Sequence, residues 1–249
     1  MNLHFFDQEN KKKNIHYVGA GESADEAGRP LFLEVNNRRL ALINIAEHEF
    51  SIASSKKYGA APVDPLVNYY QISEAKEQSD FLMLVVHGGH EMYSFPSPRM
   101  QQLYRYYIDL GVDVVIGHHP HVFSGYEIYN GKPIFYSLGN FIFDRQSTNQ
   151  KWHYGFSVIL SIRNNGTSDI LIIPYSQSLK GPGVQVLNDE EMKQFNEEMQ
   201  RCNDVITDPL KIRQEFAGFM REKRVYYLSI LMGFRKFQKK ILKRKLYPK

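Results

Sequence analysis

The sequence predicts an α/β fold built on a parallel sheet, and three features lead to this class. Continuous apolar runs at residues 39–46, 81–87 and 112–118 are typical of strands that are buried on both faces. Two segments between these runs, residues 64–79 and 97–111, carry the start and stop signals of helices. Strands that alternate with helices in this way are typical of a parallel sheet with crossover helices.

Each helical segment begins with a capping residue that is followed by a proline. Asp64 and Ser97 are good N-cap residues, because a side-chain oxygen accepts a hydrogen bond from the first free backbone N–H groups. Pro65 and Pro98 follow them at the first helical position, where the missing N–H has no partner to lose. Gly111 is typical of the residue just after a helix. We therefore expect helices that start at these caps.

The pattern changes after residue 125. Strand-like runs are joined at Asn130-Gly131 and at Asn165-Gly166, and both pairs are typical of tight hairpin turns. We expect an antiparallel β part over residues 125–175 that follows the α/β part.

Residues from 188 onwards read as two amphipathic helices followed by a basic end. We therefore divide the chain into a main domain, residues 1–187, and a helical extension with a basic amphipathic tail, residues 188–249.

The composition is that of a globular protein and limits the class of partner. Apolar residues make up 43% and charged residues 23% of the 249 residues, which is ordinary. Residues 235–249 hold eight Lys/Arg and no acid, so the preceding residues carry a formal net charge of −4. A slightly acidic body offers no basic groove for nucleic acid, and we expect no nucleic-acid partner.

Cysteine usage and apolar runs bear on the compartment. Cys202 is the only cysteine, which excludes an internal disulfide and is typical of a reducing compartment. Residues 1–14 lack the apolar core of a signal peptide. The longest apolar run, residues 225–234, is far shorter than the ~20 residues that span a bilayer. We expect a cytoplasmic protein.

Histidines follow two of the predicted strands at the point where each strand ends. His87 ends one strand, and His118 and His119 end the next, with His121 two residues later. The carboxyl ends of parallel strands share one edge of the sheet, and sites form there. Imidazoles with a nearby carboxylate are good ligands for zinc, iron or manganese.

His90 and Glu91 extend this group, because they follow His87 after two glycines. A single buried histidine is usually a structural residue with a hydrogen-bond partner. Several histidines at converging strand ends instead favour a functional cluster.

Three stretches together resemble the bacterial capsule-biosynthesis CapA family. They are HGGHE at 87–91, the segment 96–122 that ends in GHHPHV, and the segment 126–144 that contains YSLGNF; residues 15–51 match the family pattern as well. The family is associated with poly-γ-glutamate and related surface polymers and belongs to the calcineurin-like metallophosphatase superfamily. The resemblance covers roughly residues 1–180. It implies an α/β fold in which two β-sheets form a sandwich flanked by helices (αββα), with divalent metal ions at the strand ends.

The resemblance also implies roles for single residues. The lone histidine ligand of the superfamily falls on His87, and the paired ligands fall on His119 and His121, with His118 and His121 as the alternative pair. We place His90, Glu91 and Asn140 in the catalytic part of the site; Glu91 and Asn140 match family positions.

Four charged residues near these motifs receive no firm role. Glu47 and Glu49 match a subset of the family that reads E-x-E-F. Asp144 and Arg145 either close the site or form a surface ion pair, and we favour the surface pair because most exposed charges are simply solvated.

The sequence also departs from the family pattern. Members normally begin with a strand ending in Gly-Asp and later carry an Asn-Asn-His turn, and neither is found here. The chain opens inside the helix that would follow that turn, so we expect it to lack the N-terminal third of the domain. A two-metal hydrolase normally needs a bridging carboxylate to hold its ions. We therefore expect weak binding of one ion (Mn, Zn or Fe) and an impaired centre in this chain alone.

Three functional hypotheses remain open at this point. The first is a metal-dependent hydrolase of a phosphoester or similar bond in the synthesis of a capsule or other surface polymer. The second is a shortened remnant without activity. The third is a non-enzymatic accessory subunit that binds the surface polymer or its precursor. Fold alone does not decide between them. Loss of the first strands would also leave an unpaired sheet edge, and we expect self-association through it.

The tail at residues 225–249 predicts peripheral attachment to the inner face of the membrane. Phe234, Phe237 and Ile241 share one face of a helix, and basic residues occupy the rest. Such a helix lies in an anionic interface, where each lysine or arginine contributes about 1 kcal/mol. The alternative is that residues 225–234 pack on the body and the remainder is a solvated terminus.

Sedimentation with liposomes distinguishes these readings of the tail. We expect binding that requires anionic lipid, weakens with salt and disappears when residues 225–249 are deleted, because the attraction is electrostatic and is screened by salt. Equal binding to neutral vesicles, or no binding to anionic ones, would contradict the membrane interpretation.

Overall fold

The structure is a computed structural model, and it describes most of the chain. The described residues are 13, 15–48, 51–143, 147–163, 168–177, 181 and 183–225. Glu49, Asp144, Arg145, the Asn165-Gly166 turn and the tail from residue 226 lie outside them, so the predictions made for those residues stay predictions.

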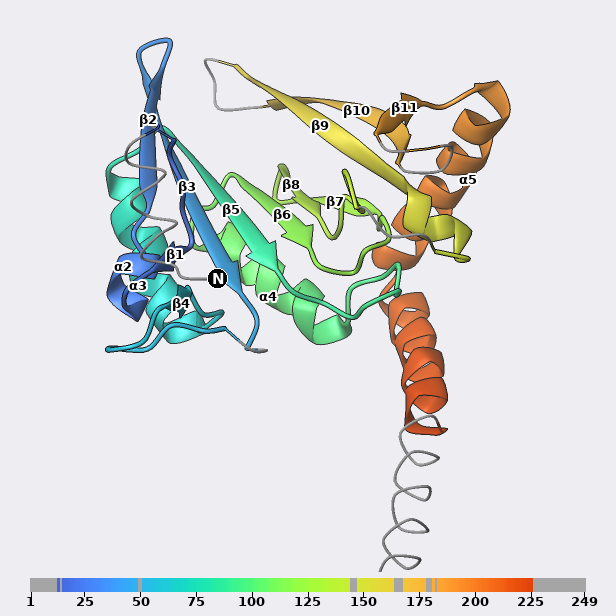
Figure 1. The fold of residues 1–249 in the computed structure, drawn as a ribbon, viewed down its shortest axis with the longest axis horizontal. Helices are drawn as coiled ribbons and strands as arrows, with labels where there is room; N and C mark the ends of the chain where they lie inside the picture. The colour runs from blue at the N-terminus through green and yellow to red at the C-terminus, as the bar shows by residue number, and fades with distance from the viewer. Residues whose placement is uncertain are drawn as a thin grey trace, which may run out of the picture.

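A six-stranded sheet forms the centre of the molecule (Figure 1). Its strands, in spatial order, are β2 (Leu31–Val35), β3 (Arg38–Ala46), β5 (Phe81–His87), β6 (Val114–His118), β8 (Lys132–Phe135) and β7 (Tyr126–Tyr129). The four inner strands run parallel, while β2 and β7 pair antiparallel at the two edges. The predicted parallel α/β sheet is confirmed.

The two predicted helices connect the parallel strands and begin at the predicted caps. Helix α3 (Pro65–Glu77) starts after Asp64, whose carboxylate accepts the backbone N–H groups of Leu66 and Val67. Helix α4 (Pro98–Asp109) starts after Ser97, whose hydroxyl oxygen accepts the N–H of Met100. Three short elements, β1 (Ala20–Gly21), α2 (Ala24–Ala27) and β4 (Gly59–Ala60), lie near the N-terminal end of the described chain.

Alternate residues of each strand face opposite sides of the central sheet, and one of these faces is covered by helices. On β3 the side chains of Ala41, Ile43 and Ile45 are almost fully buried, and they join a core formed with α3 and α4. Figure 1 shows the helices α2, α3 and α4 on this side of the sheet. Burial of such apolar side chains is worth about 1.5–3 kcal/mol each for Val, Leu, Ile and Phe, so this face anchors the sheet.

A second, antiparallel sheet stacks on the other face (Figure 1). Its strands are β9 (Tyr154–Ile162), β10 (Ser168–Gln177) and β11 (Val184–Val186), in the order β11-β10-β9. Phe81, Val114 and Phe135 of the central sheet contact Phe156 of β9 in the core between the sheets. A short 3-10 helix, η1 (Gln150–His153), precedes β9.

The hairpin at Asn130-Gly131 does not belong to this second sheet, contrary to the expectation of one antiparallel part over residues 125–175. Both turn residues have positive φ, as the hairpin prediction requires. However, β8 pairs parallel with β6, so the hairpin extends the central sheet. The turn signal is local and does not determine which sheet its strands join.

A buried ion pair ties this hairpin to α4. The guanidinium of Arg105 donates two hydrogen bonds to the carboxylate of Glu127 on β7, at 3.0 and 2.6 Å. The Tyr136 hydroxyl donates a third to the same carboxylate. The Glu127 side chain is only 5% exposed, and these donors satisfy its desolvated charge.

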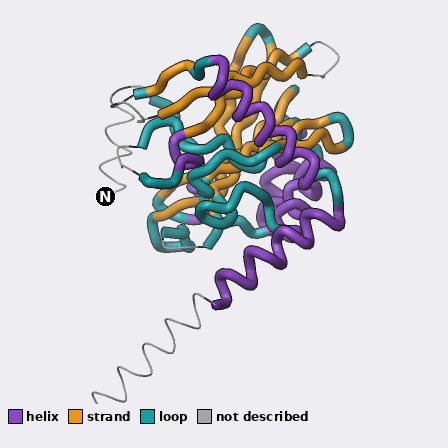
Figure 2. Tube along the Cα trace, turned by 90° about the vertical axis from the view of Figure 1, so that its right-hand side faces the viewer, coloured by secondary structure: helices purple, strands orange, loops and turns teal. Residues whose placement is uncertain are grey.

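Two further helices follow the second sheet. Helix α5 (Asp189–Ile206) begins with the capping box of Asn188 and Glu191 and buries Phe195 and Met199 against the second sheet. A helix over residues 209–225 then projects from the body (Figure 2). Neither is long and apolar enough to cross a membrane, and the same holds for every helix of the described part.

The fourth layer of an αββα sandwich is not found within the described residues. Ile159 on β9 and Leu171 and Ile173 on β10 point outward from the second sheet with exposed fractions of 49%, 57% and 42%. The described helices cover the far side of the central sheet and one end of the second sheet instead (Figure 1).

Strand β9 leaves an unpaired edge at one side of the second sheet. The Phe156 N–H donates to the carbonyl oxygen of Leu138 rather than to β10, so residue 156 directs its backbone groups away from β10. Val158 and Leu160 share that direction, and within the described chain no hydrogen bond meets them on that side. The strand also carries no charged residue, which is the usual protection of an edge.

We expect the chain to self-associate through this edge at tens of micromolar concentration, as measured by light scattering. Ile159→Lys should reduce the association, because an edge lysine disfavours pairing with a further strand. Ile128→Lys on β7 serves as the matched control, since Ile128 is similarly exposed but lies on another edge. A clean monomer of the unaltered chain would contradict the expectation, as would equal effects of the two lysines.

Candidate functional site

The register of the central sheet brings the predicted strand ends to one level. In the parallel pairing of β3 with β5, Ala46 lies beside His87, and in that of β5 with β6, His87 lies beside His118. Partners in adjacent strands point to the same face of a sheet. The histidines of two strands separated by thirty residues therefore meet at one edge, as the sequence predicts.

His87 and His119 are in direct contact. The Nε2 atom of His87 lies 3.2 Å from the Nδ1 atom of His119, and their ring centroids are 4.9 Å apart. Two imidazole nitrogens at this separation fit two ligands of one ion, because a tetrahedral site with metal–nitrogen bonds of about 2.0–2.1 Å places its donors at such a spacing.

The backbone after β6 is strained where it presents these side chains. His119 and His121 have φ angles of 109° and 61°, and Met92 in the facing loop has 60°. Left-handed conformations of this kind in residues with a Cβ cost of order 1–3 kcal/mol each and persist only where surrounding contacts hold them. One such contact is the hydrogen bond from the Met92 N–H to the Pro120 carbonyl oxygen at 2.8 Å. The observed strain supports a functional role for this loop.

Asn140 fixes the orientation of His121. Its Oδ1 atom lies 2.9 Å from Nδ1 of His121, which makes Nδ1 the protonated nitrogen in the neutral ring. Its amide group donates to the carbonyl oxygens of His121 and Trp152 at 3.1 and 3.3 Å. Asn140 therefore leaves Nε2 of His121 as the nitrogen with a lone pair.

Aromatic side chains enclose the His121 ring. Trp152 stacks on it with a centroid distance of 5.0 Å, and Phe143 packs edge-on against both rings. Gln177, which is fully buried, accepts the Phe143 N–H and donates to the Trp152 carbonyl oxygen. Of these residues, Trp152 and Gln177 lie outside the sequence motifs.

His118 is partly buried beside His87. Burial lowers its pKa, and the neighbouring His87 lowers it further. The neutral form of His118 is therefore favoured, which is the form that ligates metals.

His90 is also placed beside the site, but against the C-terminal helix. Its ring packs on Phe216 and Phe219, with centroid distances of 5.6 and 5.4 Å. Burial lowers the pKa of His90, while the charge of Glu47 opposes the shift. His90, Glu47 and His48 border a cavity of about 340 Å³ at the strand ends. A neutral half-buried imidazole is suited to accept a proton at neutral pH.

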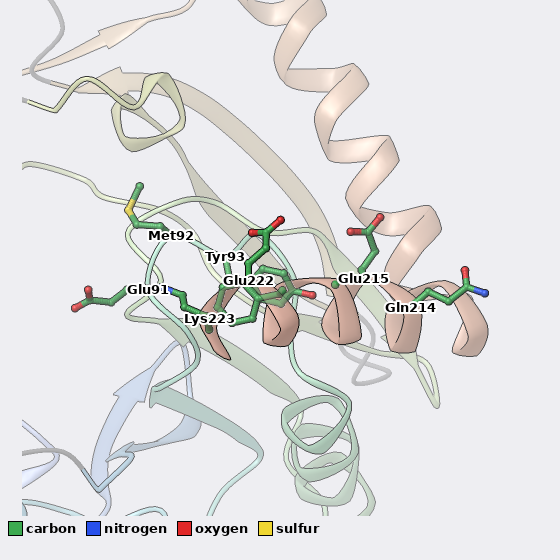
Figure 3. Close-up of a pocket in the computed structure, with 9 residues that line it drawn as sticks. Glu91, Met92, Tyr93, Gln214, Glu215, Glu222 and Lys223 are labelled. Atoms are coloured by element: carbon green, nitrogen blue, oxygen red, sulfur yellow. The ribbon is translucent and has the colours of Figure 1, made fainter. Parts of the chain in front are cut away.

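Glu91 does not join the histidines. It borders a cavity of about 540 Å³ together with residues of the 209–225 helix, among them Glu215 and Glu222. Figure 3 shows its side chain directed away from that helix. A carboxylate that does lie beside the histidine edge is that of Glu47, which accepts the Gly89 N–H at 2.9 Å.

The described residues supply two converging metal donors but not three. Within them, no group of three or more His, Cys, Asp or Glu side chains is arranged to hold a metal ion. Catalytic zinc sites typically have three protein ligands. The described residues thus supply two of the three ligands that such a divalent ion typically has.

Sequence reasoning missed the residues that support the site from a distance. Trp152, Gln177 and the aromatic residues of the 209–225 helix reach the histidines only through folding. The one sequence signal that could have indicated Trp152 is a large apolar side chain within an otherwise polar loop. Its Nε1 has no hydrogen-bond partner among the described residues.

The fold and the strand-end histidines define an α/β protein with an imidazole-rich edge, and comparison with known proteins identifies its family. The sequence profile of the family described as "Bacterial capsule synthesis protein PGA_cap" matches residues 7–145. This match covers more than half of the chain, and the chain belongs to that family.

Two curated relatives agree with this assignment. The chain is 36% identical over 166 residues to the "PGA biosynthesis protein CapA" of Bacillus subtilis, covering 66% of this chain and 43% of the relative. It is 34% identical over 170 residues to the "Capsule biosynthesis protein CapA" of Bacillus anthracis, covering 66% and 41%. The chain therefore spans less than half the length of these relatives.

One solved structure is described as a novel phosphatase from Mycoplasma pneumoniae. The alignment with it covers 67% of this chain and 61% of the phosphatase chain. Its TM-score is 0.39 and its sequence identity 14%. Similarity at this level carries no argument about activity.

The burial of His90 predicts a pH-dependent stability. Because its folded pKa lies below the ordinary 6.5, the unfolded chain binds more protons than the folded one as the pH falls below that value. The free energy of unfolding should therefore decrease from about pH 6.5 downward through the folded pKa. Urea unfolding at pH 7.5 and pH 5 in the presence of EDTA measures the difference.

In this experiment His90→Gln should lose less stability on acidification than the unaltered chain. The exposed His16 provides the control, and His16→Gln should retain the full pH dependence. An equal loss in the His90 variant would contradict the assignment.

Proposed function

We propose that this chain acts in the synthesis of a bacterial surface polymer of the poly-γ-glutamate type and contributes the histidine part of a metal-dependent hydrolase site. The observation that carries the proposal is the 3.2 Å approach of the His87 and His119 ring nitrogens at the carboxyl edge of a parallel sheet. Family membership supports the capsule role. A metallophosphatase-like sandwich is the fold that we propose for the complete domain.

The residues of the chain divide the work at this edge. His87 and His119 would hold a divalent ion such as manganese, zinc or iron, with His121 or His118 as the further candidate ligand. Asn140 holds the His121 ring in one orientation, and Trp152 shields one face of it. When bound, such an ion supplies Lewis-acid polarisation of an ester oxygen and activation of water.

His90 is the residue that we place as general base. Its burial keeps the imidazole neutral, so it is available to accept a proton. The sequence also places Glu91 in the catalytic part of the site, and its position beside the 209–225 helix makes it the weaker candidate.

A second candidate function is a non-catalytic subunit that binds the polymer or its precursor. It is favoured by the absence of a third converging ligand within the described residues. A site with only two converging ligands would be too weak to retain its ion. Binding of the polymer would then be the function that remains.

Calorimetric titration with Mn²⁺ or Zn²⁺ tests the proposal. The unaltered chain should bind the ion weakly, and the double variant His119→Ala, His121→Ala should lose more than about tenfold in affinity, because even the loss of outer hydrogen-bond partners costs ~10–100-fold. His16→Ala, remote in sequence and exposed, is the control and should bind as the unaltered chain does.

Unchanged affinity in the double variant would contradict the ligand assignment. No measurable binding to the unaltered chain would favour the non-catalytic subunit.

A further inference from the structure

A cavity beside α4 has a charge opposite to that of the body of the protein. It lies between α4 and the 209–225 helix and has a volume of about 640 Å³, within the range of about 300–1,000 Å³ usual for ligand sites. Arg99, Arg105 and Arg213 border it, against the single carboxylate of Asp109. The chain outside its basic tail carries a net negative charge, so this concentration of arginines is local.

The acidic side chains near the cavity are already engaged. Asp109 accepts hydrogen bonds from the Asn130 amide at 2.9 Å and from the Tyr129 hydroxyl at 3.3 Å. Glu127 accepts both hydrogen bonds of the Arg105 guanidinium. Arg105 is therefore paired, and the partners of Arg99 and Arg213 remain to be described.

Arg99 and Arg213 have no ion-pair or hydrogen-bond partner for their side chains within the described part of the chain. Arginine presents a planar fork of donors that matches a carboxylate with two parallel hydrogen bonds. Two unpaired forks at one cavity suit an anionic ligand with more than one carboxylate.

Different residues of the 209–225 helix border this cavity and the acidic cavity drawn in Figure 3. Arg213 and Glu215 are two residues apart, and at 100° per residue they project from nearly opposite faces of the helix. Glu215 and Glu222 project from one side of the helix in Figure 3 and border the acidic cavity. Glu215 and Glu222 therefore do not border the arginine cavity, although Lys223 joins them at the acidic one.

Arg99 also connects the cavity to the candidate catalytic edge. It borders the second cavity of about 340 Å³ that contains His90 and Glu47. An extended chain that lies against Arg213 and crosses the first turn of α4 at Arg99 therefore leads to His90. The first turn of α4 contains no acidic residue, so the partial positive charge of the helix end is not offset there.

We propose that this cavity binds a carboxylate-rich polymer, specifically a γ-linked glutamate chain, through Arg99 and Arg213 and directs it towards the histidine edge. The polymer's identity rests on the proposed function. The two arginines are contact residues for the polymer, and they take no part in the chemistry.

Binding to the full chain is measured by fluorescence anisotropy with a labelled γ-glutamate oligomer at 0.15 M salt and in EDTA. We expect the double variant Arg99→Gln, Arg213→Gln to bind roughly tenfold more weakly, as suits the loss of two charge-assisted contacts at an open cavity. The control Arg29→Gln, Arg163→Gln removes the same charge elsewhere and should stay within about twofold, because long-range attraction is screened at this salt. Circular dichroism confirms that both variants fold.

The basic segment 235–249 attracts polyanions as well, so a readout resolved by residue is needed. Modification by an arginine-selective dicarbonyl, followed by mass spectrometry, provides it. We expect saturating oligomer to slow the modification of Arg99 and Arg213 but not that of Arg29. Unchanged modification of Arg99 and Arg213 by bound oligomer would overturn the proposal, as would the absence of binding.

Two competitor polymers identify the anion. Polyphosphate and hyaluronan at matched charge should displace the oligomer poorly, and equal competition by polyphosphate would overturn the assignment to carboxylates. Because EDTA is present throughout, failure of the metal site leaves this result unaffected, so the two proposals fail separately.

Discussion

The parallel register of β3, β5 and β6 is the constraint on which the rest of the site depends. It aligns Ala46, His87 and His118 across three neighbouring strands. Any shift by one residue would turn His87 towards the helix-covered face and separate it from His119. The register is fixed by the helix-facing core, in which Ile43, Leu84 and neighbouring apolar residues are almost fully buried. The packing of this core therefore determines the geometry of the histidine edge.

The second sheet and the 209–225 helix supply further contacts to the histidine edge. The loop before β9 brings Trp152 onto His121, and Gln177 at the end of β10 holds the Trp152 backbone. The 209–225 helix covers His90 with Phe216 and Phe219. The helix also divides the charges around it between an acidic and a basic cavity. The central sheet, the second sheet and the 209–225 helix thus all contribute to one region.

The sequence predicts those parts of the structure that local signals determine. The strand at 81–87 and the helix starts after Asp64 and Ser97 agree with the structure, because apolar runs and caps act over a few residues. The placement of the Asn130-Gly131 hairpin in the central sheet does not follow from its turn, since pairing between β8 and β6 is long-range.

The site divides in the same way. The GHHPH motif correctly places His119 beside His87, because both follow strand ends in one parallel sheet. Glu91 departs from the group because the glycines after His87 and the left-handed Met92 redirect the loop. Trp152 and Gln177 contact the site through tertiary packing, which no spacing in the sequence encodes.

X-ray absorption spectroscopy of the full chain loaded with Zn²⁺ tests the central claim most directly, because it reports which atoms surround the ion. The account predicts nitrogen scatterers at about 2.0–2.1 Å with the outer-shell pattern of at least two imidazoles. That pattern should weaken in His87→Ala, which removes one of the two converging rings. A spectrum of oxygen ligands alone, or one that His87→Ala leaves unchanged, would contradict a metal site at the strand-end histidines.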